Sequence, residues 1–158
     1  MRLSTKGRYA VTAMLNLAIH DPLETMTLAD ISQRQGISLS YLEQLFAKLR
    51  KQKLVKGMRG PGGGYRLAKA GDEISVAQII AAVDGKPGSD ASGKTTRARK
   101  GQRRVTQELW DELSERLYTF LDGITLADLA DRPDVKAVTD QHLKERVRGY
   151  RTAKKSAA

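Results

Sequence analysis

Cysteine is absent from this chain of 158 residues, and His20 and His142 are its only histidines. Without thiolates there can be no disulfide framework, no cysteine nucleophile and no cysteine-ligated zinc or iron–sulfur centre. No apolar run approaches the roughly 18 residues that a membrane span needs, and the opening MRLSTKGRYA has no apolar signal segment. These absences exclude thiol chemistry, offer no metal site, and predict a soluble, cytoplasmic protein without a membrane partner.

Positive charge is abundant, since 28 Lys and Arg stand against 18 Asp and Glu, for a net charge of +10. Basic residues exceed acidic ones by 13 to 8 in residues 1–90, by 6 to 0 in 91–105 and by 6 to 1 in 141–158, whereas 106–140 has 3 against 9. Lys and Arg that neutralise phosphates release counterions, so this distribution favours a polyanionic partner. Charge alone is equally compatible with a charge that serves only solubility. The sequence motifs are needed to distinguish nucleic-acid binding from this alternative.

The first third of the chain has the pattern of helices with defined caps. An apolar stripe of helical period runs over residues 6–20 and predicts the first helix. Thr27, with Asp30 three residues later, predicts the N-cap of a short second helix that Gly36 ends.

A third helix follows almost immediately after Gly36. Ser40 and Glu43 have the spacing of a capping box, and Ser38 competes with Ser40 for the cap. The apolar side of this helix has helical spacing and consists of Leu42, Leu45, Phe46 and Leu49.

Two short β-prone runs come next, at residues 54–56 and 65–67, and they flank a glycine-rich stretch at 57–64. They predict a hairpin with a long, flexible tip. Ser75 and Gln78 then have the spacing of a capping box for another helix.

The second half begins with a polar, basic stretch at residues 85–101 that has no apolar period and predicts a loop. A long helix is predicted over 106–123, and Thr125 with Asp128 caps a last short helix. The apolar stripe of the long helix consists of Leu109, Trp110, Leu113, Leu117, Phe120 and Leu121. The predicted organisation is therefore a first domain over 1–84, a basic loop over 85–104, the two helices over 105–132, and a basic tail over 133–158.

Two helices joined by a glycine-containing turn and followed by a glycine-rich hairpin are typical of a winged helix-turn-helix. The sequence thus predicts a mainly α fold with a small β-hairpin wing. The N-terminal end of the second helix of such a motif enters the major groove of DNA. Here that end carries polar side chains that can contact bases or phosphates: Ser38, Ser40, Tyr41, Glu43 and Gln44.

Two of these side chains have distinct predicted roles. Gln44 can pair with adenine, and Glu43 can accept a hydrogen bond from a cytosine amino group. Because a carboxylate repels phosphate, Glu43 would act by rejecting sequences that offer no donor.

The predicted wing has a fixed cation, Arg59, followed by Gly60 and Pro61 and by three consecutive glycines. A thin tip lets backbone approach the phosphates, and Arg59 would insert into a groove. A merely flexible turn is the alternative. A P-loop fits poorly because no Gly-Lys-Ser or Gly-Lys-Thr follows.

Four segments carry a family pattern: MRL with KGRYA at the start, LADIS at 28–32, GISLSYLEQLF at 36–46 and RGPGGGY at 59–65. Through them the chain resembles the IscR family of bacterial iron–sulfur cluster regulators, from residue 1 to about residue 130. The resemblance implies a homodimeric transcription regulator on a palindromic operator, with Glu43 choosing between operator classes and 106–123 as the dimerisation helix. The contact set that it implies for double-stranded DNA is Arg2, Ser38, Ser40, Tyr41, Glu43, Gln44, Arg59, Gly60 and Pro61.

The chain departs from this family in the segment from Asp90 to Trp110, where three Cys and one His would hold a [2Fe–2S] cluster. Ligands are expected there at Ser92, Ala98, Arg104 and Gln107, which cannot replace thiolate and imidazole. We therefore expect no cluster and no other cofactor. Two origins stay open, a natural cluster-free relative or a chain whose cysteines were removed.

The stripe on the long helix needs a cover, and an isologous twofold pairing with a second subunit is favoured over folding back on its own winged helix. An enzyme is disfavoured because no nucleophile–base pair or catalytic motif is readable. A sequence-blind architectural nucleic-acid-binding protein is the competing function, since the basic loop and tail would suit it.

Overall fold

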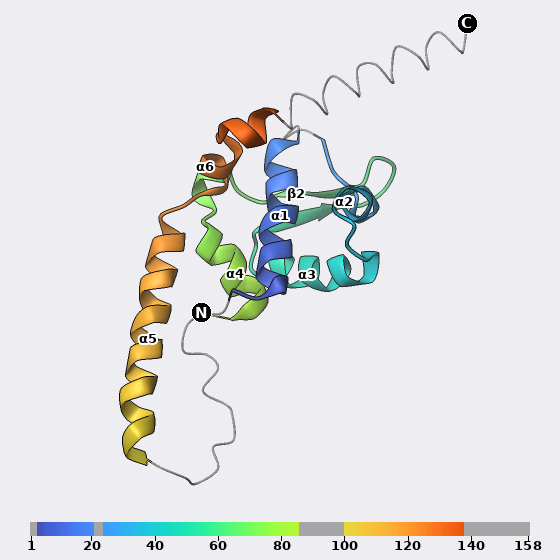
Figure 1. Cartoon of the computed structure of the whole chain (residues 1–158). Coiled ribbons are helices and arrows are strands. Elements are labelled where there is room, and N and C mark those ends of the chain that lie inside the picture. The colour runs from blue at the N-terminus through green and yellow to red at the C-terminus, as the bar shows by residue number, and fades with distance from the viewer. Residues whose placement is uncertain (1–2, 21–23, 86–99, 138–158) are drawn as a thin grey trace, which may run out of the picture.

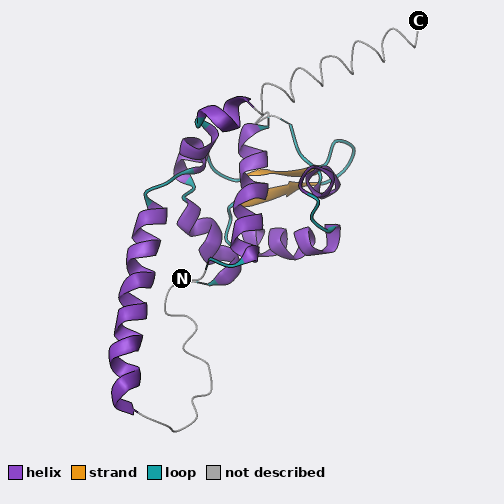
Figure 2. Ribbon diagram, in the orientation of Figure 1, coloured by secondary structure: helices purple, strands orange, loops and turns teal. Residues whose placement is uncertain are grey.

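The computed structural model describes residues 3–20, 24–85 and 100–137, with backbone alone for 100–105. Its first half contains α1 (Thr5–Ile19), α2 (Leu28–Gln35), α3 (Leu39–Lys51), β1 (Val55–Met58) and β2 (Gly64–Leu67). The short 3-10 helix η1 (Gly71–Glu73) and the helices α4 (Val76–Asp84), α5 (Lys100–Asp122) and α6 (Leu126–Ala130) follow. Helices dominate and the strands form one antiparallel pair (Figures 1 and 2), which confirms the predicted mainly α fold with a β-hairpin wing.

The core lies where α1 crosses α3 and α4 (Figure 1), and α1 packs more extensively against α4 than against any other element. Met14 of α1, Phe46 of α3 and Ile79 of α4 are completely buried there. Each such side chain contributes roughly 1.5 to 3 kcal/mol by leaving water. The predicted apolar side of α3, from Leu42 to Leu49, is buried throughout.

Local caps define most helix starts, as predicted. Thr27 and Asp30 form a reciprocal capping box, and Gly36 ends α2 in the left-handed conformation with φ of 63°. Ser75 caps α4 and Thr125 caps α6 in the same reciprocal way. The predicted cap of α3 at Ser40 is wrong.

Ser38 is the N-cap of α3, and its hydroxyl accepts a hydrogen bond from the Tyr41 N–H at 3.3 Å. An N-cap needs extended backbone, which Ser38 has with φ of −61° and ψ of 141°, whereas Ser40 already lies in the first turn. Glu43 therefore has no capping-box role, and its carboxylate is exposed to solvent.

The hairpin strands are longer and its tip shorter than predicted. Val55 pairs with Leu67 at one end and Met58 with Gly64 at the other, so Arg59 is the first residue of the tip. The outer edge of β2 is also occupied, because Met26 and Tyr65 exchange two backbone hydrogen bonds of 2.9 and 2.8 Å.

The long helix α5 starts at Lys100, inside the stretch predicted as a loop, and ends at Asp122. Its C-terminal end is tied to the start of α4, because the Ser75 hydroxyl donates to the Asp122 carboxylate at 2.6 Å and the Val76 N–H to the Ile124 carbonyl at 2.8 Å. From this anchor α5 extends beyond the other helices (Figure 1). The rest of the predicted loop, 86–99, and the tail from 138 lie outside the described residues.

In the described parts of the chain, no helix is both long and apolar enough to cross a membrane.

The α2 capping box predicts a pH-dependent contribution to stability. The hydrogen bond that the Thr27 hydroxyl donates to Asp30, at 2.6 Å, lowers the pKa of that carboxyl below its usual 3.8. A carboxyl with a depressed folded-state pKa stabilises the fold above its unfolded-state pKa, and this stabilisation is lost as the pH falls through the folded-state value. Asp30→Asn should lower the free energy of unfolding at pH 7 by roughly 0.3 to 1 kcal/mol, the usual value of a charge at a helix N-terminus.

Chemical denaturation at pH 7 and again well below pH 3.8 measures this effect, which should shrink in acid. Asp72→Asn, at an exposed carboxyl of η1, is the matched control. An Asp30→Asn deficit of equal size at both pH values would contradict the assignment.

Candidate nucleic-acid interface

The N-terminal end of α3 exposes a group of polar side chains, which we call the polar end of α3: Ser38, Ser40, Glu43 and Gln44. The opposite side of the helix is fixed in the core through Leu42, Leu45 and Phe46. The helix end is thereby held in place, and its polar side chains can contact bases and phosphates. The dipole of α3 and the free N–H groups of its first turn also favour contact with phosphates.

Tyr41 lies at the side of this surface and is half-buried. Its ring packs edge-on against Tyr9 of α1, with centroids 5.9 Å apart and planes at 86°. Tyr9, with 39% of its surface exposed, was missed by the sequence reasoning. An aromatic residue outside the apolar stripe of α1 was the signal that could have found it.

The wing presents Arg59, Gly60 and Pro61, all exposed, at its tip. The tip is a closed turn in which the Gly63 N–H donates to the Gly60 carbonyl at 2.8 Å. Arg2, the remaining predicted contact, lies outside the described residues.

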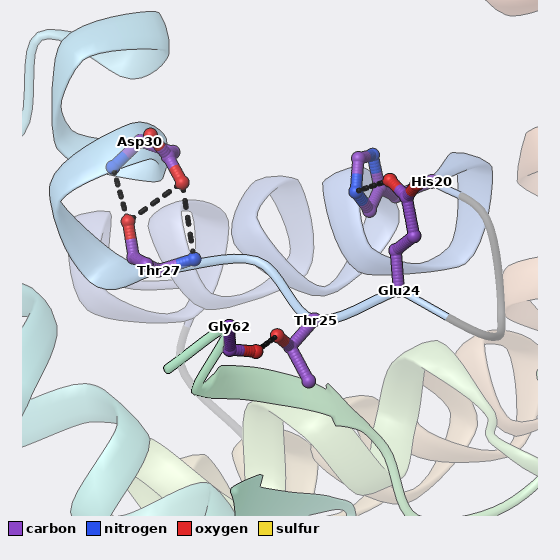
Figure 3. A network of polar contacts seen from close by, with 6 residues as sticks. All are labelled: His20, Glu24, Thr25, Thr27, Asp30 and Gly62. Carbon is purple, nitrogen blue, oxygen red and sulfur yellow. Dashed lines mark hydrogen bonds and ion pairs between the residues drawn. The ribbon is translucent and has the colours of Figure 1, made fainter. Parts of the chain in front are cut away.

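The wing is fastened to the loop that leads into α2, as Figure 3 shows. The Thr25 hydroxyl donates a hydrogen bond to the Gly62 carbonyl at the tip, and two residues later Thr27 caps α2. On the other side, Phe46 of α3 packs against Tyr65 of β2 with ring centroids 4.9 Å apart. The wing, α2 and α3 are thus held together by these contacts.

The three consecutive glycines have an intramolecular reason that differs from the predicted one. A Cβ on Gly64 would lie 2.6 Å from the Met26 carbonyl oxygen, and a Cβ on Gly63 would lie 2.7 Å from the carbonyl oxygens of Gly60 and Met58. Only Gly62, with φ of 72°, faces open space. Gly63 therefore permits a tight turn within the wing, and Gly64 permits the close approach of the backbone at Met26.

A second exposed surface is the outer side of α5, where the predicted stripe lies. Its large side chains are about half to two-thirds exposed: Leu109 61%, Trp110 59%, Leu113 50% and Phe120 66%. Leu117 and Leu121 are half-buried, nearer the end that packs against α4. Along most of its length α5 is therefore not folded back over its own winged helix. An apolar surface of this kind marks an interaction site.

The described residues contain no cluster of three or more His, Asp or Glu side chains that could hold a metal ion. His20 ends α1 as its C-cap, as expected, and its Nε2 lies 3.4 Å from the Glu24 carboxylate (Figure 3). The segment from Asp90 to Trp110 has neither Cys nor His in the sequence, so its residues do not fit the cluster of the resembled family.

A short helix, a glycine turn, a second helix with an exposed polar end and a β-hairpin wing define the class of winged helix-turn-helix DNA-binding proteins. The sequence profile of the Rrf2 family, described as iron-dependent transcriptional regulators, matches residues 3–132. The chain belongs to the Rrf2 family. It is therefore a helix-turn-helix transcriptional regulator of the IscR-like type and not an enzyme.

Among its relatives, the HTH-type transcriptional regulator IscR of Erwinia tasmaniensis is 50% identical over 148 residues, which cover 94% of this chain and 90% of that protein. IscR of Serratia proteamaculans is 52% identical over 141 residues, covering 89% and 86%. The sequence-based resemblance is confirmed.

Solved structures share the fold. IscR of T. potens is 40% identical with a TM-score of 0.63, and the match covers 82% of this chain and 85% of that one. CymR, the global cysteine regulator of B. subtilis, is 35% identical with a TM-score of 0.66, covering 82% and 96%.

Proposed function

We propose that this protein is a homodimeric, sequence-specific transcription regulator that binds a palindromic operator in the cytoplasm. The observation that carries the proposal is the exposed polar end of α3 on the same rigid unit as the wing with Arg59. A twofold dimer would present two such units, which matches the symmetry of a palindrome.

The dimer is proposed from α5. Its exposed apolar side chains, Trp110 and Phe120 among them, belong to a helix whose C-terminal end is tied to the start of α4. A second copy of the same helix is the partner that supplies a matching stripe without any other protein.

Glu43 is proposed to select among operators rather than to add affinity. Its carboxylate is exposed, and with Ser38 as the cap of α3 it has no structural task at the start of that helix. Glu43→Ala should bind operators of altered sequence as tightly as the wild-type protein does, or more tightly. Without the carboxylate there is no repulsion of phosphate and no need for a hydrogen-bond donor on the base.

Selection from randomised DNA duplexes with wild type and Glu43→Ala is the test. The variant should recover a broader motif, with the loss of information confined to a few positions in each half-site. Gln33→Ala, at an exposed residue of α2, is the control and should recover the wild-type motif. Equal information content for Glu43→Ala and wild type would remove Glu43 from the proposed interface.

The same selection also separates a regulator from an architectural protein that binds DNA regardless of sequence. A regulator should bind its selected site about 10³-fold or more tightly than competitor DNA at fixed salt. Enrichment of no motif, with affinity that depends only on salt, would identify the architectural alternative.

We propose that the protein acts without a cluster. Anaerobic incubation with iron and sulfide should leave it colourless, because no residue from Asp90 to Trp110 offers a soft ligand. The matched variant restores ligands of the type that the family resemblance implies and should gain visible absorbance: Ser92→Cys, Ala98→Cys, Arg104→Cys and Gln107→His. A stoichiometric iron–sulfur spectrum in the wild-type protein would overturn this part of the proposal.

A further inference from the structure

A cavity of about 740 Å³ lies between the end of α1, the wing strand β2, η1 and α6. Neither the polar end of α3, nor Arg59, nor the exposed stripe of α5 lines it. Its apolar wall is formed by Leu17 and Ala18 of α1, Leu67 of β2, and Ala127 and Ala130 of α6. It is therefore separate from both surfaces of the proposed function.

The carboxylates around this cavity are already engaged. Glu24 pairs with His20 at 3.4 Å, and Asp131 pairs with Lys136 at 3.1 Å. Glu73 accepts a hydrogen bond from the Ala70 N–H at 3.1 Å. Their negative charge is thus partly satisfied by groups within the protein.

The cations that line the cavity, in contrast to the carboxylates, have no partners in the described structure. Lys56 of β1, Arg66 of β2 and Lys69 line it, and the described structure gives their side chains no hydrogen bond or ion pair. The Arg66 Nε is, moreover, fully buried and lacks any acceptor. Buried polar groups are normally satisfied, and an unpartnered one requires an explanation. A guanidinium is also the side chain best shaped to receive a carboxylate.

We propose that this cavity binds a small organic anion, whose acidic group pairs with Arg66 and whose apolar body lies against Leu17 and Ala127. The apolar wall disfavours a bare inorganic anion, because such an ion would gain nothing from it. The three unpaired cations disfavour a neutral ligand.

The position of the cavity makes this ligand a candidate signal. Arg66 lies in the wing strand, whereas Ala127 lies in α6, which follows the anchored end of α5. A ligand that bridges these elements can favour one arrangement of wing and dimerisation helix over another. This regulatory role rests on the proposed function, whereas binding itself does not.

Binding can be tested with 2-naphthoate as the anionic probe, 2-naphthamide as its neutral isostere and acetate as an acid without an apolar body. The full-length protein, labelled with ¹⁵N, should show a shift of the Arg66 Nε–H resonance with naphthoate, and naphthamide and acetate should bind at least about 10-fold more weakly. Arg66→Gln should weaken naphthoate binding by about 10-fold or more, measured by calorimetry. Arg50→Gln, at an exposed residue outside the cavity, should leave it unchanged.

The site is overturned if millimolar naphthoate leaves the Arg66 Nε–H resonance of the wild-type protein unmoved, a result that needs no variant to fold. Equal affinity for naphthoate and naphthamide would overturn the anionic assignment. DNA affinity measured with and without naphthoate tests the regulatory role, and unchanged DNA affinity would overturn that role alone. Failure of the ligand-free protein to select any DNA motif would instead refute the proposed function and leave the binding result standing.

Discussion

Replacement of Trp110 and Phe120 together by alanine is expected to convert the protein from a dimer to a monomer at micromolar concentration. Each substitution is present in both subunits of a twofold pair, so four large side chains lose their burial. At roughly 1.5 to 3 kcal/mol each, their loss should raise the dissociation constant by about 10⁴-fold or more. Because both side chains are more than half exposed in the single chain, with 59% and 66% of their surfaces free, the fold of the protomer should be nearly unaffected. Operator affinity should fall with the dimer.

Sedimentation over a concentration series measures the dissociation constant, and thermal unfolding checks that the variant still folds. Glu108→Ala with Glu115→Ala is the matched double control, since both residues are exposed on α5 but outside the stripe. A wild-type protein that stays monomeric at tens of micromolar would contradict the twofold arrangement, because a weak dimer should still form there.

Helix starts were predictable where the cap and its partner lie within one turn of each other. Thr27 with Asp30 and Thr125 with Asp128 are pairs of this kind, in which the side chain of each residue bonds to the backbone of the other. Whether Ser38 or Ser40 caps α3 could not be decided from neighbouring residues alone. It depends on the turn after Gly36, where the Ser32 hydroxyl holds the Ile37 carbonyl at 2.6 Å and Ile37 is buried.

Contacts between distant segments explain what the sequence could not predict about the wing. Met26 bridges to Tyr65 across almost forty intervening positions, and Gly64 is required because the Met26 carbonyl lies against it. Nothing in the spacing of glycines reveals such a neighbour. The start of α5 at Lys100 was likewise missed, since its first residues carry charge and no apolar period.

At the candidate interface, the helical spacing from Leu42 to Leu49 predicted which side of α3 is buried. The polar side chains on the other side were therefore predicted to be exposed. The partner of Tyr41 was not readable, because Tyr9 lies on another helix. The same holds for Arg66, whose unpartnered Nε depends on how β2, α1 and α6 enclose a cavity. Periodicity reveals which side of an element is buried, but not which distant element covers it.

Arg59→Ala is expected to weaken binding to the selected operator by ~10 to 100-fold, which corresponds to about 1 to 3 kcal/mol for one specific arginine contact. Arg59 is exposed at the start of a tip that is held by the Gly63–Gly60 hydrogen bond and by Thr25 on Gly62, so its removal should leave the fold intact. A cation on a fixed tip loses little conformational freedom on binding, which is why a single side chain can have an effect of this size.

Arg132→Ala removes the same charge from an exposed residue after α6 and is the control for general electrostatic weakening. Fluorescence anisotropy at several salt concentrations, with selected and scrambled duplexes, distinguishes the two ways in which Arg59 could act. A base contact should reduce affinity mainly for the selected duplex, whereas a phosphate contact should reduce both affinities equally and lower the salt slope by about 1. Arg59→Lys adds a second criterion, because lysine cannot reproduce a bidentate contact with guanine but retains attraction to a narrow minor groove. Equal affinity of wild type and Arg59→Ala for the selected duplex would show that the wing does not contact DNA through this residue.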